Sequence, residues 1–206
     1  MRAKPAIRRA VAFIDGQNLF HSARAAFGHT HPNYDVARPS KPSVPATGVA
    51  VGSGALLHGH PGQNTDDPRW HQFWSAKLAV MGRQGVHVYS RPLRYRTKTV
   101  RLPDGTALTF MAGEEKGVDV RIALDVIRLA HRDEYDVAVL FSQDQDLSEV
   151  AEEVRTISAE RGRWLKIACA FPSSPTSRSR RGIDKTDWIR IDRATYDACL
   201  DSRDYR

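Results

Sequence analysis

Short apolar runs alternate along the chain with longer segments in which apolar residues recur at helical spacing. Residues 137–141 form one such run, which ends abruptly in a serine and two aspartates. Residues 11–14 repeat this design, because Asp15 and a glycine follow them directly. An apolar run without polar alternation is typical of a parallel strand that is covered on both faces. The pattern predicts an α/β fold in which both strands deliver carboxylates to the C-terminal edge of the sheet, where open α/β sheets bind ligands.

The remaining periodic segments continue this rhythm of strand and helix. Apolar spacing predicts helices over 18–27, 70–81, 117–131 and 147–157, and apolar runs predict strands over 86–89, 164–171 and 188–191. Between them, residues 91–110 favour an extended hairpin around the turn sequence Pro-Asp-Gly-Thr at 103–106. We expect a central, mostly parallel sheet with helices packed on it, and a single domain over residues 1–206.

Two segments show no apolar period. Residues 29–68 mix prolines with glycines, serines and histidines, and loops this long are uncommon within a compact domain. We predict a flexible insertion there, and its histidines at 29, 31, 58 and 60 are interpreted as solvated loop residues rather than as a zinc site. Residues 172–186 are rich in serine and arginine and predict a flexible basic loop.

Basic residues gather in the hairpin and in this loop. With period-2 alternation, Arg94, Arg96 and Lys98 share one face of the hairpin, while Tyr95 and its alternate neighbours share the other. The loop adds Arg178, Arg180 and Arg181. Contacts with RNA phosphates are one interpretation of these six residues, and solvated surface without a partner is an equal alternative.

Composition narrows the class of partner. The chain has 206 residues, a net charge of +7 and a pI of about 9.7, which favours a polyanionic partner, most simply nucleic acid. Its two cysteines, Cys169 and Cys199, form no metal-binding or disulfide pattern, so we expect a reducing cytoplasm. The apolar run at 11–14 is too short for a signal peptide or a membrane span, and we expect no membrane partner. A homo-oligomer remains open.

Four aspartates predict the chemistry. Asp15, Asp144 and Asp146 follow strands, and Asp119 projects from the first turn of helix 117–131 in the middle of its apolar face. Such acids, brought together without a cation, would repel one another and take up protons. Hard carboxylate oxygens suit Mg²⁺ or Mn²⁺, and the reaction implied is metal-assisted hydrolysis of a phosphodiester. Taken alone, Asp15, Asp119 and Asp144 each have an alternative explanation as a helix N-cap.

Three stretches also resemble a known family. Residues 11–18, 116–120 with Asp125 further along, and 142–147 are similar to the three signatures of NYN domains, the PIN-like ribonuclease family that includes the LabA/DUF88 group. The resemblance spans roughly residues 11–191, in the family's order. It implies a PIN-like, Rossmannoid three-layer fold and a metal-dependent endoribonuclease. One departure is Gln143, where the family often has glycine.

The resemblance also implies roles for particular residues. The four aspartates match the family's metal-binding acids, Asn18 joins them in the catalytic set, and Ser142 supports them. Asp125 matches a family acid as well, but its helical phase places it beside Arg121 and Arg128, in surface ion pairs. We therefore rank Asp125 below the other acids, as a supporting residue.

Other function classes remain as alternatives. The same fold without catalysis would be an RNA-binding, regulatory module. A receiver-like or phosphatase-like domain also gathers aspartates at strand ends, but the chain has no DxDxT sequence. Nucleotide binding is disfavoured because neither GxGxxG nor GxxxxGK[ST] occurs.

Overall fold

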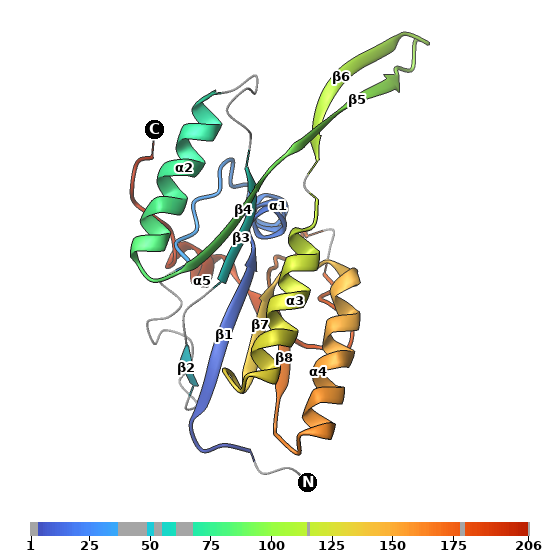
Figure 1. Ribbon diagram of the computed structural model, residues 1–206. Coiled ribbons are helices and arrows are strands. Elements are labelled where there is room, and N and C mark those ends of the chain that lie inside the picture. Colours follow the sequence, from blue (N-terminus) through green and yellow to red (C-terminus); the bar gives the residue numbers. More distant parts are fainter. Residues whose placement is uncertain are drawn as a thin grey trace.

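A parallel sheet forms the centre of the molecule (Figure 1). The computed structural model describes residues 4–36, 49–51, 55–60, 68–114, 116–177 and 180–205. Within these residues the sheet has seven strands in the order β4-β3-β1-β7-β8-β9, with the short β2 also paired to β1, and every pairing is parallel. The strands are β1 (Arg8–Asp15), β2 (Val49–Val51), β3 (Ala55–His60), β4 (His87–Pro92), β7 (Val137–Phe141), β8 (Lys166–Pro172) and β9 (Asp187–Ile191).

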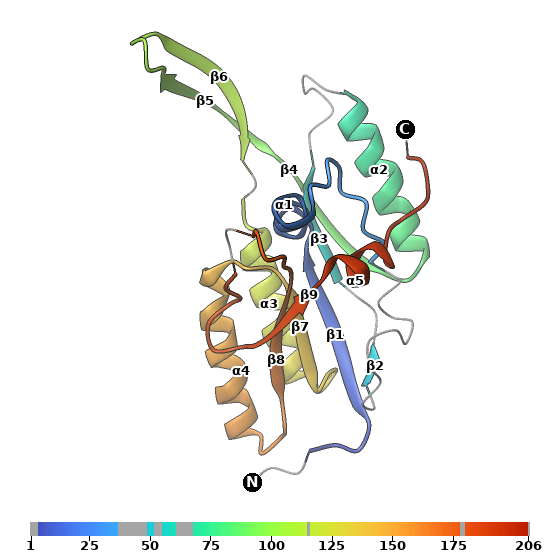
Figure 2. The same cartoon turned by 180° about the vertical axis from the view of Figure 1, so that it is seen from behind.

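Helices cover both faces of this sheet. On one face lie α3 (Val118–His131) and α4 (Ser148–Glu160); on the other lie α1 (Gly16–Phe27), α2 (Pro68–Arg83) and α5 (Arg193–Asp197) (Figures 1 and 2). In β1, Val11 and Phe13 pack towards α3 and α4, while Ala12 and Ile14 belong to the opposite cluster. Burying a side chain such as Phe13 contributes about 1.5–3 kcal/mol. The three-layer α/β fold is confirmed.

The order of the strands places a topological switch point between β1 and β7. From β1 the chain passes through α1 to β3 and through α2 to β4 on one side, and it then returns through α3 to β7 on the other side. Neighbouring strands whose connections leave in opposite directions separate at their carboxyl ends, where open α/β sheets bind ligands. Ile14 pairs with Phe141 at the carboxyl ends of β1 and β7, so Asp15 and Ser142 emerge side by side.

Part of the segment predicted as a flexible insertion is regular structure. Strand β3 lies between β1 and β4, paired with both, and Tyr34 and Val36 are buried in the core cluster beneath α1. The prediction for 29–68 is wrong for these residues. The sequence of β3, Ala-Leu-Leu-His-Gly-His, has no strand period of its own, and pairing on both edges supplies its order. Residues 37–48, 52–54 and 61–67 of that segment lie outside the described part of the chain.

A two-stranded hairpin projects from the body (Figures 1 and 2). It consists of β5 (Arg94–Arg101) and β6 (Ala107–Glu114), which pair antiparallel from Arg94 opposite Glu114 to Arg101 opposite Ala107. The predicted hairpin is confirmed, and every side chain of β5 is exposed. Among the described helices, none combines the length and apolarity that crossing a membrane requires.

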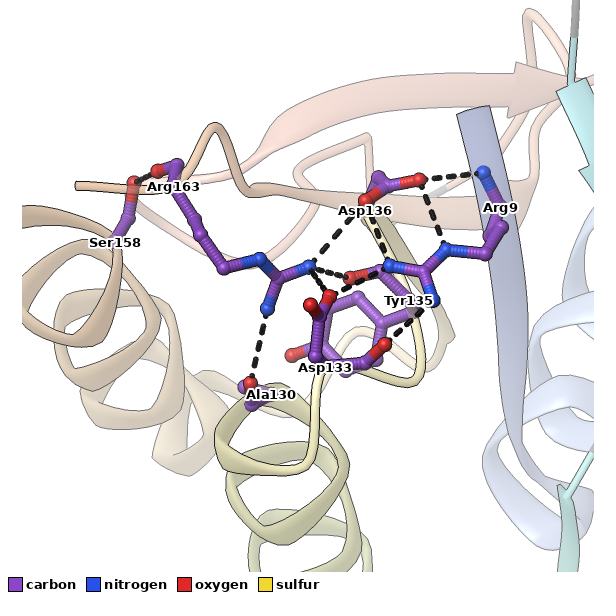
Figure 3. Close-up of polar contacts among 7 residues, drawn as sticks. All are labelled: Arg9, Ala130, Asp133, Tyr135, Asp136, Ser158 and Arg163. Atoms are coloured by element: carbon purple, nitrogen blue, oxygen red, sulfur yellow. Dashed lines mark hydrogen bonds and ion pairs between the residues drawn. The ribbon is translucent and has the colours of Figure 1, made fainter. Parts of the chain in front are cut away.

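An ion-pair network closes the amino-terminal edge of the sheet (Figure 3). The backbone N–H of Arg9 donates to Asp136 Oδ2 at 2.8 Å, and Arg9 Nη2 donates to Asp133 Oδ1 at 2.7 Å and to Asp136 Oδ1 at 3.1 Å. Arg163 Nη2 reaches the same Asp136 oxygen at 3.3 Å. Burial raises the pKa of Asp136, but its contacts with Arg9 and Arg163 outweigh burial and hold that pKa below its ordinary value. The network connects β1 to β7 at the edge of the sheet opposite Asp15 and Asp144.

Candidate active site at the carboxyl edge of the sheet

Asp15 is both the last residue of β1 and the N-cap of α1. Its Oδ1 accepts a hydrogen bond from the backbone N–H of Asn18 at 2.9 Å, and the residue is only 8% exposed. Burial raises its pKa to about 6, the capping N–H groups of Asn18 and Gln17 oppose this rise, and the negative charges of Asp144 and Asp119 add to it. Asp15 is therefore a helix cap and also a carboxylate in an acidic neighbourhood.

The loop after β7 presents the next acids. Ser142 is buried, and its Oγ accepts a hydrogen bond from the backbone N–H of Asp144 at 3.2 Å. Asp144 caps a short 3₁₀ helix, η2 (Gln145–Leu147), by accepting the N–H of Asp146 at 3.0 Å. Asp144 is thus held at its backbone N–H and at its Oδ1, whereas Asp146 is exposed on η2.

Asp119 lies in the first turn of α3. The N-cap of α3 is Gly117, with φ of 82° and no capping hydrogen bond from a side chain, so Asp119 does not cap this helix. The charge of Asp119 adds to the raised pKa of Asp15, by less than the charge of Asp144 does. That Asp119 turns towards the edge of the sheet stays a prediction.

Asp125 is engaged elsewhere on α3. Its Oδ2 accepts from Arg121 Nε at 2.9 Å, and its Oδ1 pairs with Arg128 Nη2 at 2.8 Å. These are the partners that helical phase predicts. The expectation of a surface pair is wrong, because the Asp125 side chain is only 5% exposed. Packing against the sheet buries this carboxylate, so both arginines serve to neutralise it.

Asn18 connects the two strand ends. Its Oδ1 accepts the backbone N–H of Gln143 at 2.9 Å and the hydroxyl of Ser22 at 3.5 Å. The side-chain Oε1 of Gln143 accepts from Ser22 Oγ at 2.9 Å, and its Nε2 donates to the carbonyl of Arg181 at 2.8 Å. Asn18 therefore holds α1 against the loop that carries Asp144, which is a positioning role.

The donor chemistry of the acids suits a hard divalent cation. Asp15, Asp119 and Asp144 offer carboxylate oxygens, and their mutual repulsion is relieved by positive charge. Across the described residues, however, no three or more His, Cys, Asp and Glu side chains stand close enough together to hold a metal ion. The residues fit Mg²⁺ or Mn²⁺ in kind, and the compact four-acid cluster expected from the sequence is not assembled.

Comparison with known proteins identifies the family. The sequence profile of the NYN domain matches residues 9–179. The chain belongs to the NYN domain family. NYN domains belong to the PIN-like nuclease superfamily, in agreement with the sheet and with the position of its acids. A search of curated proteins finds no match.

A solved structure shares the fold of this NYN domain. A protein of unknown function from Vibrio parahaemolyticus shares 22% identity at a TM-score of 0.55, over 93% of this chain and 97% of that one. Ribokinase from Giardia lamblia, at 11% identity and a TM-score of 0.34, covers 62% of this chain and 37% of its own. The first similarity supports the fold alone, and the second carries no argument.

The cations predicted to bind RNA are partly engaged within this NYN domain. Lys98 Nζ lies 2.8 Å from Glu114 Oε1, and Arg96 Nε lies 3.8 Å from Glu114 Oε2. The hydrogen bond and charge of Lys98 hold the pKa of Glu114 below its ordinary value. All three predicted hairpin cations, including Arg94, are nevertheless exposed.

The loop arginines have partners within their own segment. Arg180 donates to the carbonyls of Ser177, at 3.2 Å, and Pro175. Arg181 forms a two-pronged contact with Asp184, with Nη2 at 2.9 and 3.0 Å from its two oxygens. Arg178 lies outside the described residues. Phosphate binding by this loop therefore competes with bonds that already order it.

Two features of the site were missed in the sequence. Arg91 is exposed near the start of α3, with its guanidinium carbon 5.6 Å from the centre of the Tyr89 ring, and its Nη1 lies 3.1 Å from where a Cβ on Gly117 would stand. Gln145 holds the basic loop against η2, since its Nε2 donates to the carbonyl of Gly182 at 2.9 Å. An arginine in a run of basic residues and a loop glutamine give no signal before the fold is known.

Proposed function

We propose that this NYN domain is a metal-dependent endoribonuclease that hydrolyses RNA phosphodiester bonds at the carboxyl edge of its sheet. The observation that carries the proposal is Asp15: a buried carboxylate at the carboxyl end of β1, beside β7, with its pKa raised by burial and further by the charges of Asp144 and Asp119. Carboxylates with perturbed pKa values are enriched at functional sites, which supports a role for Asp15 in binding a cation. Membership of a nuclease superfamily supports the same reaction class.

The roles of the residues follow from their positions. Asp15, Asp119 and Asp144 would hold Mg²⁺ or Mn²⁺, with Asp146 as an exposed further ligand. A bound divalent cation supplies charge neutralisation at the phosphate and lowers the pKa of a water molecule. Asn18 keeps α1 and the β7 loop in register, and the buried Ser142 hydroxyl fixes the backbone of Asp144.

Arginines near the edge would hold the substrate. Arg91 lies beside Gly117 at the start of α3, and the hairpin cations extend the basic surface away from the body. Contacts of arginine or lysine with phosphate position a nucleic acid and are largely blind to its sequence. The proposed substrate is therefore RNA bound through its backbone beside the acids.

A second candidate function is an RNA-binding, regulatory NYN module with little or no catalysis. One observation favours it: the acids of the described residues are not gathered into a three-ligand metal centre. In this alternative the basic surface keeps its role, and the acids contribute only caps and local structure.

Cleavage of labelled RNA separates the two functions. Purified protein is incubated with a mixed-sequence RNA in EDTA, in Mg²⁺ and in Mn²⁺. We expect cleavage only with metal, and its loss in Asp15→Asn and Asp144→Asn. Asp192→Asn is the matched control, because Asp192 caps α5 by accepting the N–H of Thr195 at 2.8 Å, at the end of β9 and two strands away from β7. Cleavage that survives both site variants removes these acids from the mechanism, and binding without cleavage in any metal favours the regulatory module.

A further inference from the structure

One face of the hairpin combines exposed cations with exposed apolar side chains. In the antiparallel register Arg94 lies opposite Glu114, Arg96 opposite Ala112 and Lys98 opposite Phe110, and residues paired in this way point to the same side. The next pair on this side is Val100 with Leu108. We call this surface the basic face. Two-stranded ribbons are marginally stable alone, so a partner that covers this face would also order the hairpin.

Phe110 is the aromatic residue of the basic face, and its ring is open to solvent. Phe110 is 43% exposed on a strand that projects from the body. The ammonium group of Lys98, although directly opposite Phe110, extends along the ribbon to Glu114, four residues further along β6. The cation therefore stands beside the ring and does not cover it.

The opposite face of the hairpin has a different character. Two of its cross-strand pairs satisfy one another: Thr97 Oγ1 donates to Met111 Sδ at 3.4 Å, and the hydroxyls of Thr99 and Thr109 lie 3.0 Å apart. Tyr95 and Arg101 are the exposed aromatic and the exposed cation of this face. Met111, the neighbour of Phe110 in sequence, is 54% exposed on this side. The two faces thus provide an internal comparison within one strand.

We propose that the basic face binds single-stranded RNA, with one base stacked on Phe110 and the flanking phosphates held by Arg94, Arg96 and Lys98. The inference rests on the proposed function for its choice of RNA. Single-strand sites combine an aromatic platform with cations that track the backbone. In a duplex the faces of the bases are stacked on one another, so no base face is open for Phe110 to stack on.

Charge argues against a second copy of the chain as the occupant. Two basic faces pressed together would bring Arg94, Arg96 and Lys98 of each copy against the same cations of the other, while a single Glu114 neutralises part of each set. Like charges across an interface oppose association. A polyanion with flat apolar rings satisfies both the cations and the exposed Phe110.

The test measures RNA binding by fluorescence anisotropy in EDTA, where no metal-dependent cleavage occurs. The probes are a labelled single-stranded RNA of mixed sequence, the same strand in a duplex, and an abasic ribose-phosphate strand of equal length. We expect the first to bind more tightly than the other two. Stacking of one base predicts that Phe110→Ala weakens single-strand binding about fivefold to hundredfold. Met111→Ala, on the other face, is expected to change binding less than about twofold.

Further variants distinguish the loss of stacking from a disrupted hairpin. Phe110→Leu keeps an apolar side chain at the position and is expected to lose affinity as Phe110→Ala does, whereas Phe110→Trp is expected to retain it. Three results would each overturn the stacking site. They are wild-type affinity in Phe110→Leu, equal losses of affinity in Phe110→Ala and Met111→Ala, and equal binding of the single strand and the duplex. A wild-type dimer in sedimentation velocity that dissociates in Phe110→Ala would assign the face to a second copy instead.

The outcome is independent of catalysis. Metal-dependent cleavage by a protein whose Phe110 variants bind like wild type refutes the stacking site and leaves the nuclease proposal standing. Stacking-dependent binding without cleavage in Mg²⁺ or Mn²⁺ refutes the nuclease proposal and leaves the basic face standing.

Discussion

Replacing Asp15 by asparagine is expected to stabilise the metal-free protein at neutral pH. Asparagine caps a helix about as well as aspartate, so the hydrogen bond with the Asn18 N–H is retained. What the substitution removes is a buried charge close to Asp144 and Asp119. A variant at a proposed active site that gains stability would show that the wild-type side chain is kept at an energetic cost.

The size of the effect follows from the pKa of Asp15. Folding raises it from 3.8 to about 6. Two pKa units correspond to about 3 kcal/mol, as an upper estimate. Because the folded state binds this proton more tightly than the unfolded chain, wild-type stability falls as pH rises from about 4 to about 6, and the loss is complete above that range. The advantage of Asp15→Asn should therefore be about 0.5 kcal/mol at pH 4 and approach about 3 kcal/mol at pH 7.

Thermal unfolding in EDTA between pH 4 and pH 8 measures this difference. For a protein of this size 3 kcal/mol corresponds to roughly 6 to 12 °C in Tm. Asp192→Asn is the control, since the hydrogen bonds with Thr195 hold the pKa of Asp192 below its ordinary value and its loss should not stabilise. A second series in Mn²⁺ should stabilise wild type by about 2.7 kcal/mol at a hundredfold excess over Kd, and Asp15→Asn much less. Parallel pH profiles for wild type and Asp15→Asn would refute the reasoning.

Three further predictions follow from the contacts around the site. Asp125→Ala should lower the free energy of unfolding in urea by about 1–3 kcal/mol, because it leaves two arginines without their buried partner, while Mn²⁺ affinity and cleavage persist. Asp119→Ala should instead keep its stability and lose Mn²⁺ affinity and cleavage. Equal inactivity of the two folded variants would contradict this assignment. Arg91→Ala should lower the slope of log affinity against log salt by about 0.7, the value for one single-strand phosphate, with stability unchanged; an unchanged slope would make Arg91 a solvated residue. Alanine at all three cations of the basic face should flatten the same slope by about two units.

Local patterns in the sequence predicted which acids follow the ends of strands, although they did not predict the spacing between those acids, for a physical reason. Strand ends and helical phase depend on the order of neighbouring residues, so Asp15 and Asp144 could be assigned to the sheet edge and Asp125 to its two arginines before any contact was known. The degree of burial could not be predicted in this way. Asp125 is nearly inaccessible because α3 packs against the sheet, and helical phase alone says nothing of how deep the packing goes.

Features that depend on pairing between distant segments could not be predicted from the sequence. Strand β3 has no apolar alternation and becomes a strand because β1 and β4 bond both of its edges. Glu114 meets Lys98 only because the hairpin register places β6 against β5, so counting cations along β5 overestimates the free positive charge. Gln143 likewise shows its contact with the loop at Arg181 only in the folded chain.

The two explanations offered for the aspartates, helix cap and functional acid, are compatible with each other. Asp15 and Asp144 each give Oδ1 to a capping N–H, at 2.9 and 3.0 Å. An ionised carboxylate has about four acceptor positions, so capping leaves capacity for a ligand. The cap also fixes the direction of the side chain, which a site of defined geometry needs. A strand that ends where a helix begins therefore directs a carboxylate to the edge of the sheet. The proposed function requires the charge of that carboxylate, and substitution by asparagine removes the charge while it keeps the cap.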